Sequence, residues 1–223
     1  MPGVIAGFYG KLPARGDFVR NGLPRDFTDP WDAWLSRVIT GSRGRMGEGW
    51  LPAFLESPVW RFVLAQGLCG ERTAVGLMLP SVDRAGRYFP LTFAALLGRD
   101  AAATDPAWLD RCEAAGRAAL EQDAAPDQIA GMLGAAGDAA GSDSWSVWGE
   151  GEGSGQSLWW TDGAPRVAAT RFAISGMPNA CVYATMLGAA AADDQAAEAV
   201  QTTREWDPVP DTPAGRDPLE PPS

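Results

Sequence analysis

The sequence contains no histidine and, among its 18 basic residues, only one lysine, Lys11. Without histidine, Ser-His-Asp and Cys-His catalytic arrangements are excluded, and so is the commonest general base and metal ligand in proteins. A Ser-Lys pair would have to use Lys11, and no serine nucleophile stands beside it. These absences leave few routes to catalysis, and we expect neither a metal nor a cofactor.

Cysteine and basic charge are also scarce. The three cysteines lie far apart and form no C-x-x-C pair, so buried free thiols in a reducing cytosol are expected. The formal net charge of -10 opposes binding to nucleic acid or to anionic membrane surfaces. No apolar run approaches the length that spans a bilayer, and the N-terminus does not resemble a signal peptide. We therefore expect a cytoplasmic protein with no nucleic-acid partner and no membrane insertion.

Helices are predicted in four places. In residues 29–39, DPWDAWLSRVI, Asp29 can cap a helix and Pro30 fits its first turn. Apolar side chains recur there at helical spacing and indicate a face that packs on a core: Trp31, Trp34, Leu35, Val38 and Ile39. The other helices are two between 105 and 140, starting at Pro106 and Pro126, and one at 177–200.

Short runs of β-prone residues predict strands in two blocks. The first block has a strand at 3–9 and a three-stranded meander at 58–97, with turns near Gly70 and at 81–86. Within the meander, residues 74–79 are almost all apolar, which indicates a strand covered on both faces. The second block has strands at 145–149, 156–163 and 166–174. Strands in two blocks with helices around them predict an α/β (α+β) sandwich, whose central, mainly antiparallel sheet is covered by helices on both faces. We expect one domain over 1–203 and an acidic, proline-rich tail over 204–223.

The segment GFYGKLPARGDF, residues 7–18, invites comparison with a phosphate-binding loop because glycine precedes its lysine. The pattern G-x-x-x-x-G-K-[ST] requires glycine at position 5 and a hydroxyl at position 12, where the chain has Ile5 and Leu12. In addition, Pro13 would interrupt the helix whose N-terminus should face the phosphates. We therefore do not expect a nucleotide here.

Two charged loops are the best candidates for a binding surface, because binding residues concentrate on loops held by a rigid scaffold. Their charged residues are Lys11, Arg15 and Asp17 in the first loop and Asp83, Arg84 and Arg87 in the second. We expect the two loops to lie near one another and to form a contact surface. The alternative is structural: Asp17 pairs with Arg84 or Arg87 and forms a buried brace between the loops.

The adjacent pair Trp159 and Trp160 must face opposite sides of its predicted strand. One of the two is either an interface anchor or is buried beneath a helix on the other face. We take Trp160 as a further candidate contact residue.

Five segments together resemble the TagF (ImpM) family of type VI secretion system-associated proteins: GFYGKLPARGDFVRNGLP, DPWDAWL, SPVWRF, GLMLPSVDRAGRYFPLT and SLWWTDG. The resemblance covers roughly residues 5–190. Its most specific parts are G-K-L-P-x-x-G-D-F and P-S-V-D-R-x-G-R-Y-F-P, and the tail after Arg204 lies outside it.

The resemblance implies an α/β sandwich and a non-enzymatic, cytoplasmic accessory protein that represses bacterial type VI secretion after translation. It also implies the forkhead-associated scaffold protein Fha as the partner. A second hypothesis, from another class, is a small-molecule sensor or cryptic hydrolase that uses the carboxylates and arginines of the two loops. A deep pocket at Lys11, Asp83 and Arg84 would support that hypothesis, and a convex or shallow surface there would count against it.

Overall fold

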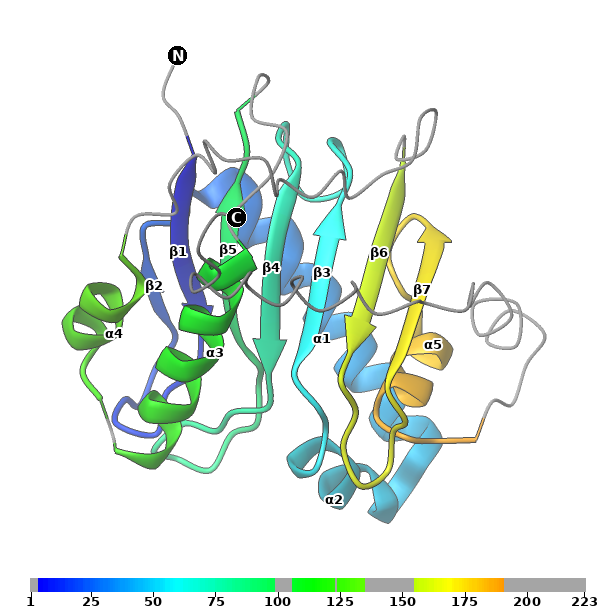
Figure 1. Cartoon of the computed structure of the whole chain (residues 1–223). Helices are drawn as coiled ribbons and strands as arrows, with labels where there is room; N and C mark the ends of the chain where they lie inside the picture. The colour runs from blue at the N-terminus through cyan, green and yellow to red at the C-terminus, as the bar shows by residue number, and fades with distance from the viewer. Residues whose placement is uncertain (1–3, 99–105, 123, 135–154, 191–223) are drawn as a thin grey trace, which may run out of the picture.

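One sheet of seven strands organises the part of the chain that the computed structural model describes, residues 4–98, 106–122, 124–134 and 155–190 (Figure 1). The strands are β1 (Ile5–Gly10), β2 (Val19–Asn21), β3 (Trp60–Leu64), β4 (Ala74–Leu79), β5 (Leu91–Leu96), β6 (Gln156–Thr161) and β7 (Thr170–Ser175). Their order across the sheet is β2-β1-β5-β4-β3-β6-β7, and every neighbouring pair is antiparallel. The predicted antiparallel sheet is confirmed.

Helices cover both faces of this sheet. They are α1 (Arg25–Met46), α2 (Trp50–Leu55), α3 (Pro106–Glu121), α4 (Pro126–Leu133) and α5 (Ala180–Met186), with a 3-10 turn at Gly47–Gly49 between α1 and α2. In Figure 1, α1, α2 and α5 lie behind the sheet, and α3 lies in front of it. The buried residues accordingly form two clusters, one on each face, and α4 contributes to the second with α3. The α+β sandwich is therefore confirmed.

The first core is built around tryptophan. All five residues of the predicted apolar face on α1 are buried, with Trp31 fully enclosed. The Trp31 ring lies 4.7 Å from that of Phe62 on β3, and the Trp34 ring lies 5.5 Å from that of Trp159 on β6. The indole N–H of Trp31 donates to the hydroxyl of Thr92 on β5 at 3.0 Å. Helix α1 is thus fixed across the middle of the sheet.

The centre of the sheet is buried from both sides. Every residue of β4 and β5 is buried, because alternate side chains enter the first and the second core. The unbroken apolar run of Ala74–Leu79 predicted such a strand, and the structure confirms it.

Helix α1 begins at Arg25, so Asp29 does not cap it, and Pro30 lies inside the helix. The carbonyl of Pro24 instead accepts hydrogen bonds from the N–H groups of Phe27 and Thr28, and both of these residues are buried. Burial of this extra turn outweighs the single hydrogen bond that Pro30 cannot donate.

The other differences lie at the ends of elements. Strand β7 starts at Thr170 because the backbone first forms a small turn in which Ala164 bridges Val167. Helix α5 starts only at Ala180, where the Asn179 side chain accepts from two backbone N–H groups, and it ends at Met186. The three-residue strand β2 and the short helix α2 were not predicted. The predicted strand at 145–149, the second part of the predicted helix at 177–200 and the tail at 204–223 lie outside the described residues.

All three cysteines are free thiols, as expected. Cys69 and Cys112 are buried, whereas Cys181 is partly exposed. Burial raises the pKa of the Cys69 thiol to about 12, which keeps it protonated and unreactive at neutral pH. Within the described ranges, no helix has the length and apolar composition needed to cross a bilayer.

Candidate functional site

The two charged loops meet at one end of the sheet. The first loop, residues 11–18, follows β1, and the second loop, residues 80–90, joins β4 to β5. Because β1 and β5 are antiparallel neighbours, the end of one lies beside the start of the other. A Cβ at Gly10 would lie 2.2 Å from the carbonyl oxygen of Pro90, and the φ of Gly10 is +146°. Only glycine allows the backbones to approach this closely.

A buried ion pair connects the loops. The Nζ atom of Lys11 lies 2.6 Å from Oδ2 of Asp83, and the side chains are 5% and 0% exposed. The same oxygen accepts from Nε of Arg87 at 2.7 Å. The other carboxylate oxygen, Oδ1, accepts from the backbone N–H groups of Ala85 and Arg87, both at 2.9 Å. Four donors therefore satisfy this carboxylate, which compensates for its removal from water.

Further hydrogen bonds join the two loops directly. The Ser81 hydroxyl donates to the backbone carbonyl of Lys11 at 2.7 Å, and the N–H of Arg84 donates to the carbonyl of Arg15 at 2.9 Å. The Arg87 guanidinium also donates to the carbonyl of Gly16. Residues 11–18 and 80–90 together form the loop crossing. Its backbone is held by these contacts and by the ion pair.

The buried ion pair and hydrogen bonds around Asp83, together called the brace, favour the ionised form of its carboxyl group. Burial alone would raise the pKa of its carboxyl group, but the hydrogen bonds from Lys11, Arg87 and Ala85 outweigh burial and hold that pKa well below its usual range. Asp83 therefore remains charged at any physiological pH.

The lowered pKa of Asp83 predicts acid sensitivity. A carboxyl group whose pKa is lowered by folding stabilises the protein above its unfolded pKa of about 3.9, and this contribution is lost as the pH falls toward the folded pKa. We expect the urea midpoint of the wild-type chain to fall more steeply below pH 4 than that of Asp83→Asn. The urea midpoint is measured by tryptophan fluorescence from pH 5 to pH 2.5. If it fell equally steeply with pH in both chains, the lowered pKa of Asp83 would be contradicted.

The structure brings the six charged residues predicted for the site together in the loop crossing but gives them different roles. Lys11 and Asp83 are buried and cannot meet a partner directly, whereas Arg15, Arg84 and Arg87 are exposed. The predicted pairing of Asp17 with Arg84 or Arg87 is wrong. The acid of the brace is Asp83, while Asp17 is exposed and accepts from the N–H of Phe18 at 2.8 Å. Both aspartates have arginine neighbours in sequence, so sequence alone could not distinguish them.

Phe18 is a member of the loop crossing that sequence reasoning missed. Its ring is 39% exposed, and the Lys11 ammonium lies 4.3 Å from the ring centroid. The ring stacks on Tyr9 at 5.5 Å and meets Phe89 edge-on at 4.8 Å. Its signal in the sequence is an aromatic residue placed directly after the charged residues of the first loop.

Trp160 does not belong to the loop crossing. It lies on β6, which is separated from β5 by β3 and β4. Trp159 is fully buried in the first core, and Trp160 is half-buried against the second core, so the two rings face opposite sides as predicted.

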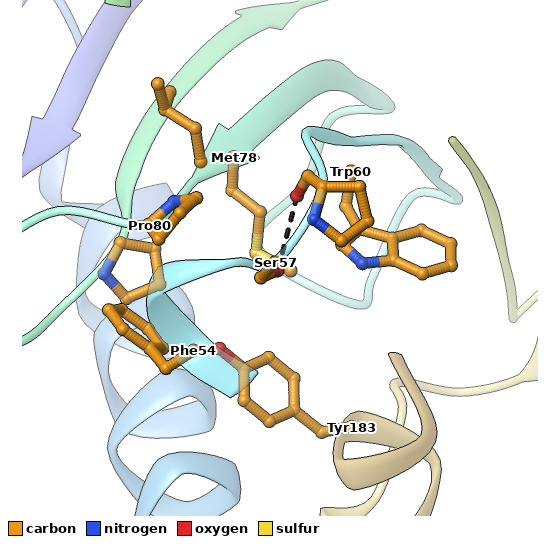
Figure 2. A pocket seen from close by; sticks show the side chains of 9 residues that line it. Phe54, Ser57, Trp60, Met78, Pro80 and Tyr183 are labelled. Atoms are coloured by element: carbon orange, nitrogen blue, oxygen red, sulfur yellow. Dashed lines mark hydrogen bonds between the residues drawn. The ribbon is translucent and has the colours of Figure 1, made fainter. Parts of the chain in front are cut away.

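The described structure contains a small and a larger hollow that are lined by other residues than Lys11, Asp83 and Arg84. Figure 2 shows the smaller one, about 10 Å³, among Phe54, Met78 and Tyr183, where the Ser57 hydroxyl donates to the carbonyl of Pro58. It has room for about one water molecule. The larger hollow, about 370 Å³, lies beside β7 and α5. Neither hollow supports the hypothesis of a sensor or hydrolase that uses the charged loops.

Comparison with known proteins gives a family match and structural matches. The family model of the TagF N-terminal domain, described as type VI secretion system-associated, matches residues 7–136. The crystal structure of PA0076 from Pseudomonas aeruginosa PAO1 matches with a TM-score of 0.70 at 35% sequence identity, over 82% of this chain and 93% of that chain. No curated protein matches. The family model includes both charged loops.

Proposed function

The chain belongs to the TagF family of type VI secretion system-associated proteins, and from this membership we propose that it is a repressor that binds a component of the secretion machine. It is an accessory protein of that system. In the proposal it acts in the cytoplasm, after translation and by binding rather than by catalysis, and its partner is the forkhead-associated scaffold protein Fha.

One observation favours the loop crossing as the surface that contacts the partner. The loop crossing presents exposed Arg15, Arg84 and Arg87 on a backbone that a buried ion pair holds in place. A rigid, exposed surface is suited to a protein partner, because little conformational entropy is lost when the complex forms. Arginine is also enriched in the residues that dominate interface energies.

The double variant Arg15→Glu/Arg84→Glu is expected to lose both partner binding and repression. The two side chains are exposed, and the hydrogen bond between the two residues uses backbone atoms, so the fold is retained. Partner binding is measured by a pull-down of purified Fha. Repression is measured as the amount of the secretion machine's tube protein that is secreted by a strain in which each variant replaces the wild-type chain.

The matched control is Arg37→Glu/Arg171→Glu, which changes the charge equally at exposed arginines outside the loop crossing. It should bind and repress like the wild type. Melting temperatures of both double variants should stay close to that of the wild type, because surface substitutions usually change stability by less than about 0.5 kcal/mol. Full repression by Arg15→Glu/Arg84→Glu would show that the loop crossing is not the contact surface.

A further inference from the structure

We infer, relying on the proposed function for the use of this surface, that the loop crossing binds a short acidic segment of its protein partner. In this inference, anionic groups of the segment pair with Arg15 and Arg84, and an apolar side chain packs on Phe18. The anionic groups are carboxylates or a phosphate, which share the same chemistry toward arginine.

The local charge is opposite in sign to that of the whole molecule. The chain carries a formal net charge of -10, but the loop crossing, residues 11–18 and 80–90, contains four basic residues and two acidic ones. One of the acids, Asp83, already faces Lys11 and Arg87 inside the brace. The outer surface of the loop crossing is therefore cationic in an otherwise anionic protein, and such a patch attracts an anionic partner while the rest of the surface repels it.

Two guanidinium groups are available for a ligand. In the described part of the chain, the side chains of Arg15 and Arg84 make no hydrogen bond or ion pair. The backbone hydrogen bond from Arg84 to Arg15 places these residues side by side, and the Arg84 guanidinium lies 4.0 Å from where a Gly16 side chain would begin. Each planar guanidinium can hold a carboxylate or phosphate through two parallel hydrogen bonds.

Phe18 supplies an exposed apolar contact on the same loop as Arg15. It is one of few large apolar residues that the described structure exposes. Its ring is held by Tyr9, Phe89 and the Lys11 ammonium, and the Tyr9 hydroxyl in turn donates to Asp32 at 2.7 Å. An aromatic ring that is already ordered loses little entropy on binding. Aromatic and arginine side chains side by side are typical of interface centres.

The test uses the purified full chain, labelled with ¹⁵N, and three pentapeptides. They are Glu-Glu-Leu-Glu-Glu, its glutamine counterpart Gln-Gln-Leu-Gln-Gln, and Gln-Gln-Leu-phosphothreonine-Gln. With at least one anionic peptide, we expect changes in amide chemical shift centred on Gly16, Phe18 and Gly86. The Kd of that peptide should be at least about tenfold lower than that of the glutamine peptide, because a charge-assisted hydrogen bond contributes about 1.5 to 3 kcal/mol. Raising the salt concentration should weaken the binding.

Two charge-reversal variants test whether peptide binding depends on Arg15 and Arg84. Arg15→Glu/Arg84→Glu should abolish these shifts, and Arg37→Glu/Arg171→Glu should keep them. Binding of only the phosphothreonine peptide supports the inference with phosphate as the anionic group. The inference is overturned if the glutamine peptide binds equally well, if neither anionic peptide binds, or if the shifts are centred elsewhere. It is also overturned if shifts at the loop crossing depend only on protein concentration, because a second copy of the chain would then be the occupant.

This experiment separates the inference from the proposed function. A chain that binds an anionic peptide but neither binds Fha nor lowers secretion would contradict the repressor proposal alone. A chain that represses secretion through Arg15 and Arg84 without binding either anionic peptide would contradict the acidic segment alone.

Discussion

Replacing Trp31 with alanine is expected to lower the free energy of unfolding by about 3 to 5 kcal/mol, the usual cost of removing a buried tryptophan side chain. The side chain is 0% exposed, and its loss would also leave the buried Thr92 hydroxyl without its donor. It would remove contacts with four aromatic rings, those of Phe27, Trp34, Phe62 and Trp159. Urea unfolding followed by far-ultraviolet circular dichroism measures the change.

The matched variant Trp31→Phe separates ring packing from the hydrogen bond. It keeps an aromatic ring in the stack but removes the indole N–H that Thr92 accepts from, so we expect a cost of about 1 to 3 kcal/mol. Because whole domains are stable by only about 5 to 15 kcal/mol, Trp31→Ala should leave a chain close to unfolding. A cost below about 1 kcal/mol for Trp31→Ala would mean that the tryptophan cluster does not dominate this core.

The second large effect is expected at Lys11. The substitution Lys11→Met keeps an unbranched apolar stem but removes the ammonium group that lies 2.6 Å from Asp83. We expect a loss of about 3 kcal/mol, near the lower end of the range for breaking a buried ion pair, because Arg87 and two backbone N–H groups still contact the carboxylate. For a chain of this size, the melting temperature should fall by about 6 to 12 °C.

The control Arg37→Met removes one positive charge from an exposed position and should leave the melting temperature nearly unchanged. Lys11→Met that melts like this control would show that the ion pair contributes nothing to stability. Binding distinguishes the two roles considered for Lys11. Below its melting temperature, a chain that has lost only a brace should retain more partner binding than Arg15→Glu/Arg84→Glu.

Local sequence patterns predicted those helices and strands whose burial follows from the order of apolar residues within the element itself. The spacing of Trp31, Trp34 and Leu35 predicted the buried face of α1, because a helix places residues three and four apart on one side. The unbroken apolar run of Ala74–Leu79 predicted a strand buried on both faces. Element ends were predicted less well. The first turn of α1 depends on the burial of Phe27, which no local capping signal at Asp29 could reveal.

The sequence by itself determined that histidine chemistry is absent, that the two charged loops are the notable polar features, and that the chain resembles the TagF family. Tertiary structure alone decided what those loops do. Lys11 and Asp83 are 72 residues apart, and only the pairing of β1 with β5 brings them together. Burial and the choice of an ion-pair partner arise from packing between distant segments, whereas composition and motifs are local. For that reason the sequence could name Lys11, but only the fold could place it inside the brace and leave Arg15, Arg84 and Phe18 on the surface.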